Sequence, residues 1–299
     1  MKVQRILMLF TLLLIVRSAA ALNVFACEPE WAALAQELGG DKVTVYSATT
    51  ALQDPHQIQA RPSLIAQIRK ADLVVCTGAE LEIGWLPVLL RQGGNNNVRP
   101  GTPGNFMAAE SVRMLEAATR LDRSEGDVHP YGNPHIQTDP RNIAKVAQAL
   151  AQRLAELDAG QSAYYAERHR NFTARWQQAM QRWEQQAAPL RGVPIVVQHK
   201  SWVYMQDWLG LVEVATLEPK PGIPPSSGYL AEVLTHLKQQ PARMVIRAAY
   251  QDKRSSEWLS KQTGIPAVEL PFTVGGNDNA KDLFALFDDT LAQLLSVIK

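Results

Sequence analysis

The chain has 299 residues, of which 46% are hydrophobic, and its 30 Lys and Arg residues stand against 29 Asp and Glu, giving a formal net charge of +1. Nucleic-acid-binding domains carry a clustered basic excess, so this even balance argues against nucleic acid as a partner. The length exceeds the usual size of a single domain and predicts two lobes of ordinary size.

The N-terminal residues have the pattern of a secretory signal. Met1–Arg5 is basic, Ile6–Val16 is an apolar run, and the following residues end in the small side chains of 18–21, so cleavage is expected after Ala21. The apolar run is shorter than a membrane-spanning helix requires. Cleavage would leave 27 basic against 29 acidic residues, a net charge of −2. We therefore expect an exported protein; a buried N-terminal helix is the alternative.

Short β-branched runs alternate with amphipathic segments in both halves of the chain. In the first half, strands are expected at 24–26, 43–46 and 73–75, and helices at 31–38 and 64–70. In the second half, strands are expected at 195–197, 212–215, 244–246 and 267–270, and helices at 202–208, 229–239, 257–263 and 280–298. This alternation predicts an α/β fold of two lobes, each with a parallel β-sheet flanked by helices.

The segment between the two halves predicts one long helix. Residues 161–188 contain neither glycine nor proline, and Gly160 and Pro189 bound them. At about 1.5 Å per residue, such a helix is roughly 40 Å long. We expect it to join the lobes as a rigid strut. The chain then divides into a signal peptide (1–21), an N-terminal lobe (22–160), a linking long helix (161–190) and a C-terminal lobe (191–299).

Capping residues mark three helix starts. Asp139 followed by proline predicts a helix over 141–157. Ser227 is expected to cap the helix at 229–239. Asn279, with Asp282 three positions later, predicts that the last helix begins at residue 280.

Each of the two cysteines follows an expected strand. Cys27 comes after the strand at 24–26, and Cys76 comes after the strand at 73–75. An exported chain meets an oxidising compartment, so the thiols can form a disulfide if those strands are neighbours. A cysteine metal ligand is the alternative. The residues before Cys27 resemble a lipid-attachment box only faintly, and because Arg17 and about ten residues separate it from the apolar run, no lipid is expected there.

Three of the six histidines are far apart in the sequence, each in a short polar turn. His56 follows the strand at 43–46 by a polar loop, His199 follows the strand at 195–197 almost directly, and His135 precedes a capped helix. In open α/β sheets, ligands gather beyond the carboxyl ends of strands. Imidazole is the commonest protein ligand of zinc and its neighbours. These residues therefore predict a transition-metal site between the two lobes.

Several motifs together resemble one known family. They are Asp54-Pro55-His56 with Arg61-Pro62-Ser63, Ala71 to Val75 with Thr77-Gly78, Asn133-Pro134-His135 leading into Asp139-Pro140, His199 before an aromatic helix, and Glu218 to Ile223. In this order they are similar to the zinc- and manganese-binding solute-binding proteins of ABC importers. The resemblance implies two α/β lobes joined by a long backbone helix. It also implies a cleft metal held by His56, His135 and His199, and delivery to a membrane permease driven by a cytoplasmic ATPase.

The sequence departs from that family at the fourth ligand. The family usually supplies a carboxylate, from the loop after the last strand of the second lobe or from a glutamate beside the first histidine. Here Pro55 precedes His56, and the first acid after the last strand is Asp278. Asp278 is the expected fourth ligand, and Glu80, Glu82, His129 or a water are the alternatives. Asp278 would otherwise complement the positive N-terminus of the last helix.

Three imidazoles with one oxygen donor favour zinc over manganese, which prefers more oxygen ligands. The expected function is high-affinity capture of zinc in the periplasm and delivery to an importer permease, without enzymatic activity. A manganese carrier of the same type is the nearest alternative, followed by a zinc-dependent hydrolase and a metal-binding adhesin. The expected protein is a monomer that works with the permease and its ATPase, with a metallochaperone as a further candidate partner.

Overall fold

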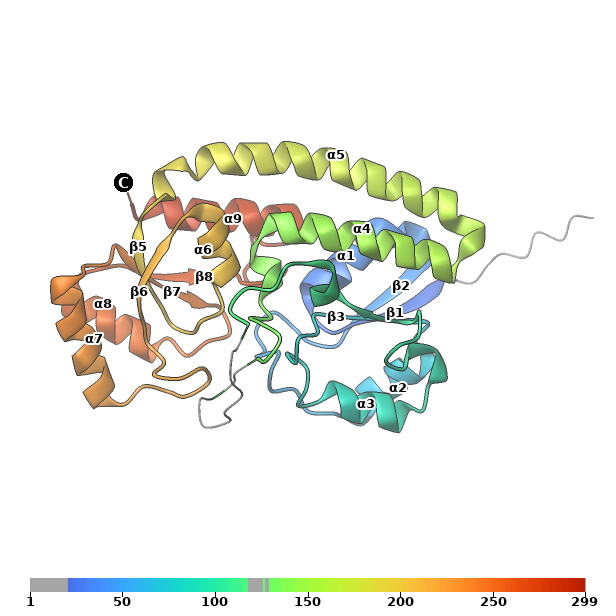
Figure 1. Cartoon of the computed structure of the whole chain (residues 1–299), viewed down its shortest axis with the longest axis horizontal. Coiled ribbons are helices and arrows are strands. Elements are labelled where there is room, and N and C mark those ends of the chain that lie inside the picture. The colour runs from blue at the N-terminus through green and yellow to red at the C-terminus, as the bar shows by residue number, and fades with distance from the viewer. Residues whose placement is uncertain (1–20, 118–125, 127–128, 299) are drawn as a thin grey trace, which may run out of the picture.

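The computed structural model describes residues 21–117, 126 and 129–298 and contains two four-stranded sheets (Figure 1). The first has the strand order β2-β1-β3-β4 and consists of β1 (Leu22–Ala26), β2 (Val43–Ser47), β3 (Leu73–Cys76) and β4 (Asn105–Met107). The second has the order β6-β5-β7-β8 and consists of β5 (Pro194–Val197), β6 (Val212–Thr216), β7 (Met244–Ala248) and β8 (Ala267–Leu270). All paired strands are parallel, so the carboxyl ends in each sheet meet at one edge.

Helices flank both sheets, and one of them joins the two halves. The first half contributes α1 (Pro29–Gly39), α2 (Pro62–Lys70), α3 (Leu86–Gly93) and α4 (Pro140–Leu157). The second half contributes α6 (Val203–Leu209), α7 (Ser227–Gln239), α8 (Arg254–Thr263) and α9 (Leu283–Ser296). Between them, α5 (Ser162–Gln186) runs along the length of the molecule above both sheets (Figure 1). The expected α/β fold with a long joining helix is confirmed, while the exact lobe boundaries at 160 and 190 stay predictions.

The central strands send alternate side chains into different apolar cores. Val24 of β1 and Ile195 of β5 belong to one large cluster that also takes in side chains of α4, α5 and α9. Phe25 lies on the opposite face of the first sheet with α2 and α3, and Val196 lies on the opposite face of the second with α7 and α8. Successive strand residues point to opposite faces, so each sheet is buried on both sides. The large cluster is continuous across the two halves.

The sequence pattern does not predict α3 or β4. α3 has eight residues with a proline in its first turn, and β4 is a three-residue edge strand. Neither segment is long enough to carry a readable period.

The structure confirms one of the three expected helix caps. The Asp139 side chain accepts a hydrogen bond from the backbone N–H of Arg141 at the start of α4. In α7 the capping side chain is Ser226 rather than the expected Ser227. The expected start of the last helix at residue 280 is wrong. Asn277 binds the backbone N–H of Ala280 in a separate turn, and Asp282 caps α9.

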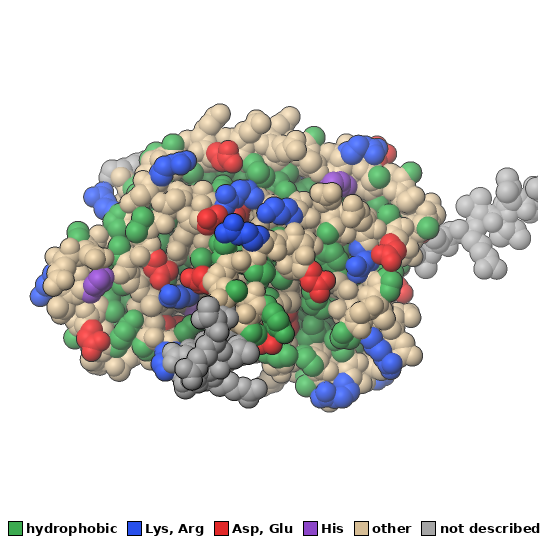
Figure 2. All heavy atoms as spheres, viewed as in Figure 1, with side chains coloured by type: hydrophobic (Ala, Val, Ile, Leu, Met, Phe, Trp, Pro, Cys, Tyr) green, Lys and Arg blue, Asp and Glu red, His purple; other side chains and the backbone are tan. Residues whose placement is uncertain are grey.

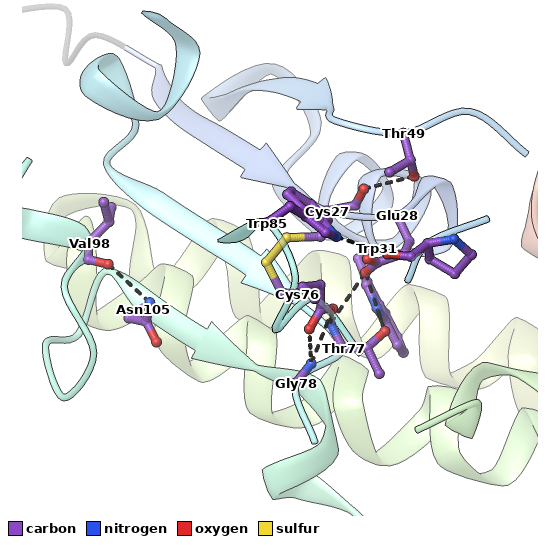
Figure 3. The surroundings of a disulfide bond; sticks show 12 residues. Cys27, Glu28, Trp31, Thr49, Cys76, Thr77, Gly78, Trp85, Val98 and Asn105 are labelled. Carbon is purple, nitrogen blue, oxygen red and sulfur yellow. Dashed lines mark hydrogen bonds between the residues drawn. A yellow bond between two sulfur atoms is a disulfide. The ribbon is translucent and has the colours of Figure 1, made fainter. Parts of the chain in front are cut away.

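Cys27 and Cys76 form a disulfide at the ends of β1 and β3 (Figure 3). Ala26 is opposite Val75 in the adjacent parallel strands, so the two cysteines are the next pair along. Their Cα atoms are 4.8 Å apart, within the range that a disulfide spans. The expected bond is confirmed, and neither sulfur is a thiolate ligand for a metal.

Two buried glutamates lie directly beyond the disulfide. Glu28 follows Cys27, and its Oε2 accepts a hydrogen bond from the backbone N–H of Thr77 at 3.3 Å (Figure 3). Glu82 accepts from the same N–H at 2.7 Å. Burial raises the pKa of Glu28 well above its usual value, and the charges of Glu82 and Glu30 raise it further. Burial also raises the pKa of Glu82 to about 7. The pair therefore holds at least one proton at neutral pH.

We predict that Glu28→Gln raises the melting temperature of the metal-free protein more at pH 8 than at pH 5. The folded-state pKa of Glu28 is raised, so above the unfolded value of about 4.3 the folded protein binds more protons than the unfolded chain and loses stability as the pH rises. Glutamine does not titrate and can still accept from Thr77. Scanning calorimetry at the two pH values should show a difference on the order of a few degrees. Glu184→Gln, at an exposed position of α5, is the control, and an equal gain at both pH values would contradict the prediction.

Charged side chains of both signs are interspersed over the face shown in Figure 2. Among the described residues, the helices are all too short or too polar to cross a bilayer. Residues 1–20 of the predicted signal peptide (1–21) lie outside the described residues.

Candidate metal centre

Three histidine rings from three separate loops meet between the two sheets. His56 comes from the loop after β2, His199 from the loop after β5, and His135 from the segment before α4. The ring centroids are 5.3 Å apart for His56 and His135, 5.7 Å for His135 and His199, and 5.9 Å for His56 and His199. One nitrogen of each ring lies within 4.8 Å of the other two. The structure thus brings together the three histidines that the sequence singles out.

Two of these rings have a carboxylate at their outer nitrogen. Nδ1 of His56 is 2.8 Å from Oδ1 of Asp54, which also accepts the backbone N–H of His56. Nδ1 of His199 is 2.7 Å from Oε2 of Glu218, which also accepts the backbone N–H of Gly222. A protonated Nδ1 that donates to a carboxylate leaves Nε2 with its lone pair available. Asp54 and Glu218 therefore orient two imidazoles as metal ligands would be oriented.

His135 is the most deeply buried of the three, with 1% of its surface exposed. Neither of its ring nitrogens has a hydrogen-bond partner in the described part of the chain. Leaving a buried donor or acceptor without a partner costs about 1–3 kcal/mol. Burial lowers the pKa of His135 well below its usual value, and the neighbouring His56 and His199 lower it further. The ring is therefore neutral, and a cation on one nitrogen would supply a missing partner.

The loop that carries His135 is held by the second half of the chain. The Asn133 side chain accepts the backbone N–H of His135 at 3.1 Å and donates to the carbonyl of Lys200 at 2.6 Å. The hydroxyl of Tyr204 in α6 donates to the carbonyl of Asn133 at 2.8 Å. Residues near β5 thus position a histidine that precedes α4.

A fourth histidine lies beside this cluster. Nε2 of His129 is 3.3 Å from Nε2 of His56, and the two ring centroids are 5.3 Å apart. Burial, followed by the charges of His56 and His199, lowers the pKa of His129 to about 4. No nitrogen of His129 belongs to the group of ligand atoms from His56, His135 and His199 that all lie within 4.8 Å of one another. It does line a cavity of about 110 Å³ together with His135 and His199.

The carboxylates expected as a fourth ligand do not join the three histidines. Asp278 is exposed and does not belong to the cluster of ligand atoms. Glu80 is not in that cluster either, and the carboxylate of Glu82 accepts the backbone N–H groups of Thr77 and Gly78. After β8, the side chain that reaches the cluster belongs to Phe272, whose ring centroid is 5.5 Å from that of His135. The loop after the last strand therefore supplies an aromatic contact at this point.

The sequence does not reveal the roles of Asp54 and Glu218. Asp54 has a local signal, because an aspartate that binds the backbone two residues later forms a common turn. Glu218 has no such signal, since 19 residues separate it from His199. Both residues belong to the motifs that suggest the family, but the pairing with histidine becomes visible only in the fold.

The arrangement suits a small cation that prefers nitrogen. Zinc binds imidazole nitrogen at about 2.0–2.1 Å, so two ligands of one tetrahedral zinc are about 3.3 Å apart. The three nitrogens, all within 4.8 Å of one another, need only a small inward movement to reach this geometry. A larger cavity of about 460 Å³, lined by His56, His199, Asp54 and Glu218 among others, adjoins them.

Curated relatives of the chain include transport proteins for two metals. The high-affinity zinc uptake system protein ZnuA of Bacillus subtilis is 20% identical over 250 residues, which cover 82% of this chain and 76% of that protein. The manganese ABC transporter substrate-binding lipoprotein scaA of Streptococcus gordonii is 27% identical over 151 residues. That match covers 50% of this chain and 46% of the relative, so it spans less than half of the relative's length.

The fold and the family also match known examples. A crystal structure of ZnuA superposes with a TM-score of 0.76 at 22% identity, covering 93% of this chain and 100% of that one. The family model for the periplasmic component A of the zinc-uptake complex matches residues 24–297. Because this match covers nearly all of the described residues, the chain belongs to the ZnuA family of metal-binding components of ABC transporters.

Proposed function

We propose that the protein captures zinc through His56, His135 and His199 and delivers it to the permease of an ABC importer. One observation carries the proposal: imidazoles from loops of both sheets converge, with one nitrogen of each within 4.8 Å of the others. The buried, unpartnered ring of His135 supports it, since a bound cation would satisfy that ring.

Zinc is preferred to manganese because of the donor atoms. Nitrogen-rich tetrahedral sites suit zinc, whereas manganese favours oxygen, and zinc lies above manganese in the general affinity order. The relatives include carriers named for zinc and for manganese, so the ligand set of this chain supports the choice.

Substrate-binding proteins of ABC importers work with a permease and an ATPase, and we propose these as the partners here. We further propose a periplasmic, monomeric protein exported by a cleavable signal. A metallochaperone that loads the metal is a further proposed partner. The disulfide between Cys27 and Cys76 supports export, because such bonds persist in oxidising compartments.

We predict that replacing any one of His56, His135 and His199 with alanine lowers zinc affinity at least tenfold, because each removes one nitrogen from the coordination shell. Isothermal titration calorimetry of the metal-free protein at pH 7.5 measures the effect. The wild type should bind one zinc per chain and should bind manganese more weakly.

His169→Ala is the matched control, since His169 lies on α5 and contacts Thr173 rather than the cluster. Undiminished affinity in two of the three cluster variants would refute the site. Incubation of the zinc-loaded protein with ester and peptide substrates should give no turnover, and sustained turnover would favour the hydrolase alternative.

We predict that Asp54→Ala and Glu218→Ala each weaken zinc binding by about 10–100-fold. Without its carboxylate partner, the ring of His56 or His199 is no longer held in one orientation and one tautomer. Asp252→Ala is the matched control. Asp252 lines the same 460 Å³ cavity but pairs with Arg254. Equal affinity for zinc in the control and in both test variants would show that the carboxylates do not support the ligands.

A further inference from the structure

We propose that His129 is the fourth protein ligand of the metal, so that the cargo is held by four imidazoles. This inference rests on the proposed function and specifies the site more closely. It assigns the fourth position to a residue in the segment between β4 and α4, in place of the carboxylate expected at Asp278.

The distance between His129 and His56 is the first support. Their Nε2 atoms are 3.3 Å apart, which is about the separation of two nitrogens on one tetrahedral zinc. Since Nδ1 of His56 faces Asp54, its Nε2 is the nitrogen directed at His129. In the metal-free protein, one of these two nitrogens carries a proton. A bound cation would take the place of that proton.

The surroundings of His129 are the second support. Its ring also lies near the backbone of Ala79. Metal-binding histidines commonly have an outer carboxylate or backbone partner, as His56 has Asp54 and His199 has Glu218. Ala79 and Glu80 both have positive φ angles, 51° and 67°, which are unusual for residues other than glycine. The turn beside His129 therefore has an uncommon backbone conformation.

The cavity next to the cluster gives the ring room to complete the site. His129, His135 and His199 all line the cavity of about 110 Å³. His129 must move inward to bring its nitrogen within reach of the other two rings, and this space allows the movement. Glu116 lines the same cavity, but its carboxylate is 3.3 Å from the side-chain nitrogen of Asn133, which donates to it.

Four imidazoles would define the class of cargo. A tetrahedral shell of neutral nitrogen ligands suits zinc and cobalt(II) and disfavours manganese and magnesium, which need oxygen. It also leaves no open position for a metal-bound water, which hydrolytic zinc requires. The site would then hold its metal as cargo without activating water.

The test is X-ray absorption at the zinc edge on the zinc-loaded, full-length chain, which counts imidazole ligands by the scattering of their ring atoms. The wild type is expected to show four imidazoles, and His129→Ala and the more conservative His129→Asn are each expected to show three. Zinc should still bind one per chain in both variants, with affinity lower by about tenfold or more. Asp278→Ala should keep all four.

Three imidazoles in the wild type, or an unchanged count in both His129 variants, would overturn the proposal. Loss of one oxygen ligand in Asp278→Ala would overturn it as well and would restore Asp278 as the fourth ligand. Failure of the proposed function would look different. In that case the wild type would bind no zinc, or His56→Ala, His135→Ala and His199→Ala would bind it normally.

Discussion

The apolar core shared by both sheets is the constraint on which the metal centre depends. Trp176 and Trp183 of α5 are almost fully buried. Trp176 contacts Phe284 of α9 with ring centroids 4.8 Å apart, and Trp183 contacts Phe287 at 5.1 Å. The indole N–H of Trp176 also donates to the carbonyl of Pro140 at the start of α4. Truncating a buried tryptophan typically costs about 3–5 kcal/mol. These contacts hold α4, α5 and α9 together and so fix one sheet relative to the other.

This rigidity determines how the histidines meet. β2 and β5 belong to different sheets, and the loops that follow them carry His56 and His199. Because the sheets are already fixed, those loops need to span only a short distance to bring the rings together. A wide separation of the two sheets would require a few hinge residues to undergo large changes in their backbone dihedral angles. A continuous α5 with buried contacts to both halves opposes such a change, so we expect metal binding to draw in the rings rather than to rotate whole lobes.

The parts of the fold that follow from local pattern could be predicted from the sequence. The apolar runs of β1 and β5 and the helix without glycine or proline give clear signals, whereas the eight-residue α3 does not. The three histidines are recognisable because each lies in a polar turn beside a strand or helix. The fourth ligand could not be assigned, since the ring of His129 meets that of His56 only in the folded chain, across a sequence separation of 73 residues. Long-range pairing of this kind has no local signature.

Charge balance explains why the fourth ligand need not be a carboxylate. Imidazoles are neutral when they bind a metal, so a zinc ion held by histidines alone keeps its charge of +2. A buried charge is costly unless it is paired. Asp54 and Glu218 each place one carboxylate behind a ligating ring, at 2.8 and 2.7 Å from Nδ1, and together they offset that charge. Burial raises the pKa of Asp54, but its hydrogen bonds with His56 and the charges of His56 and His199 together outweigh this effect and lower the pKa of the carboxyl group. A third carboxylate such as Asp278 in the coordination shell would make the site negative overall, whereas His129 leaves it neutral.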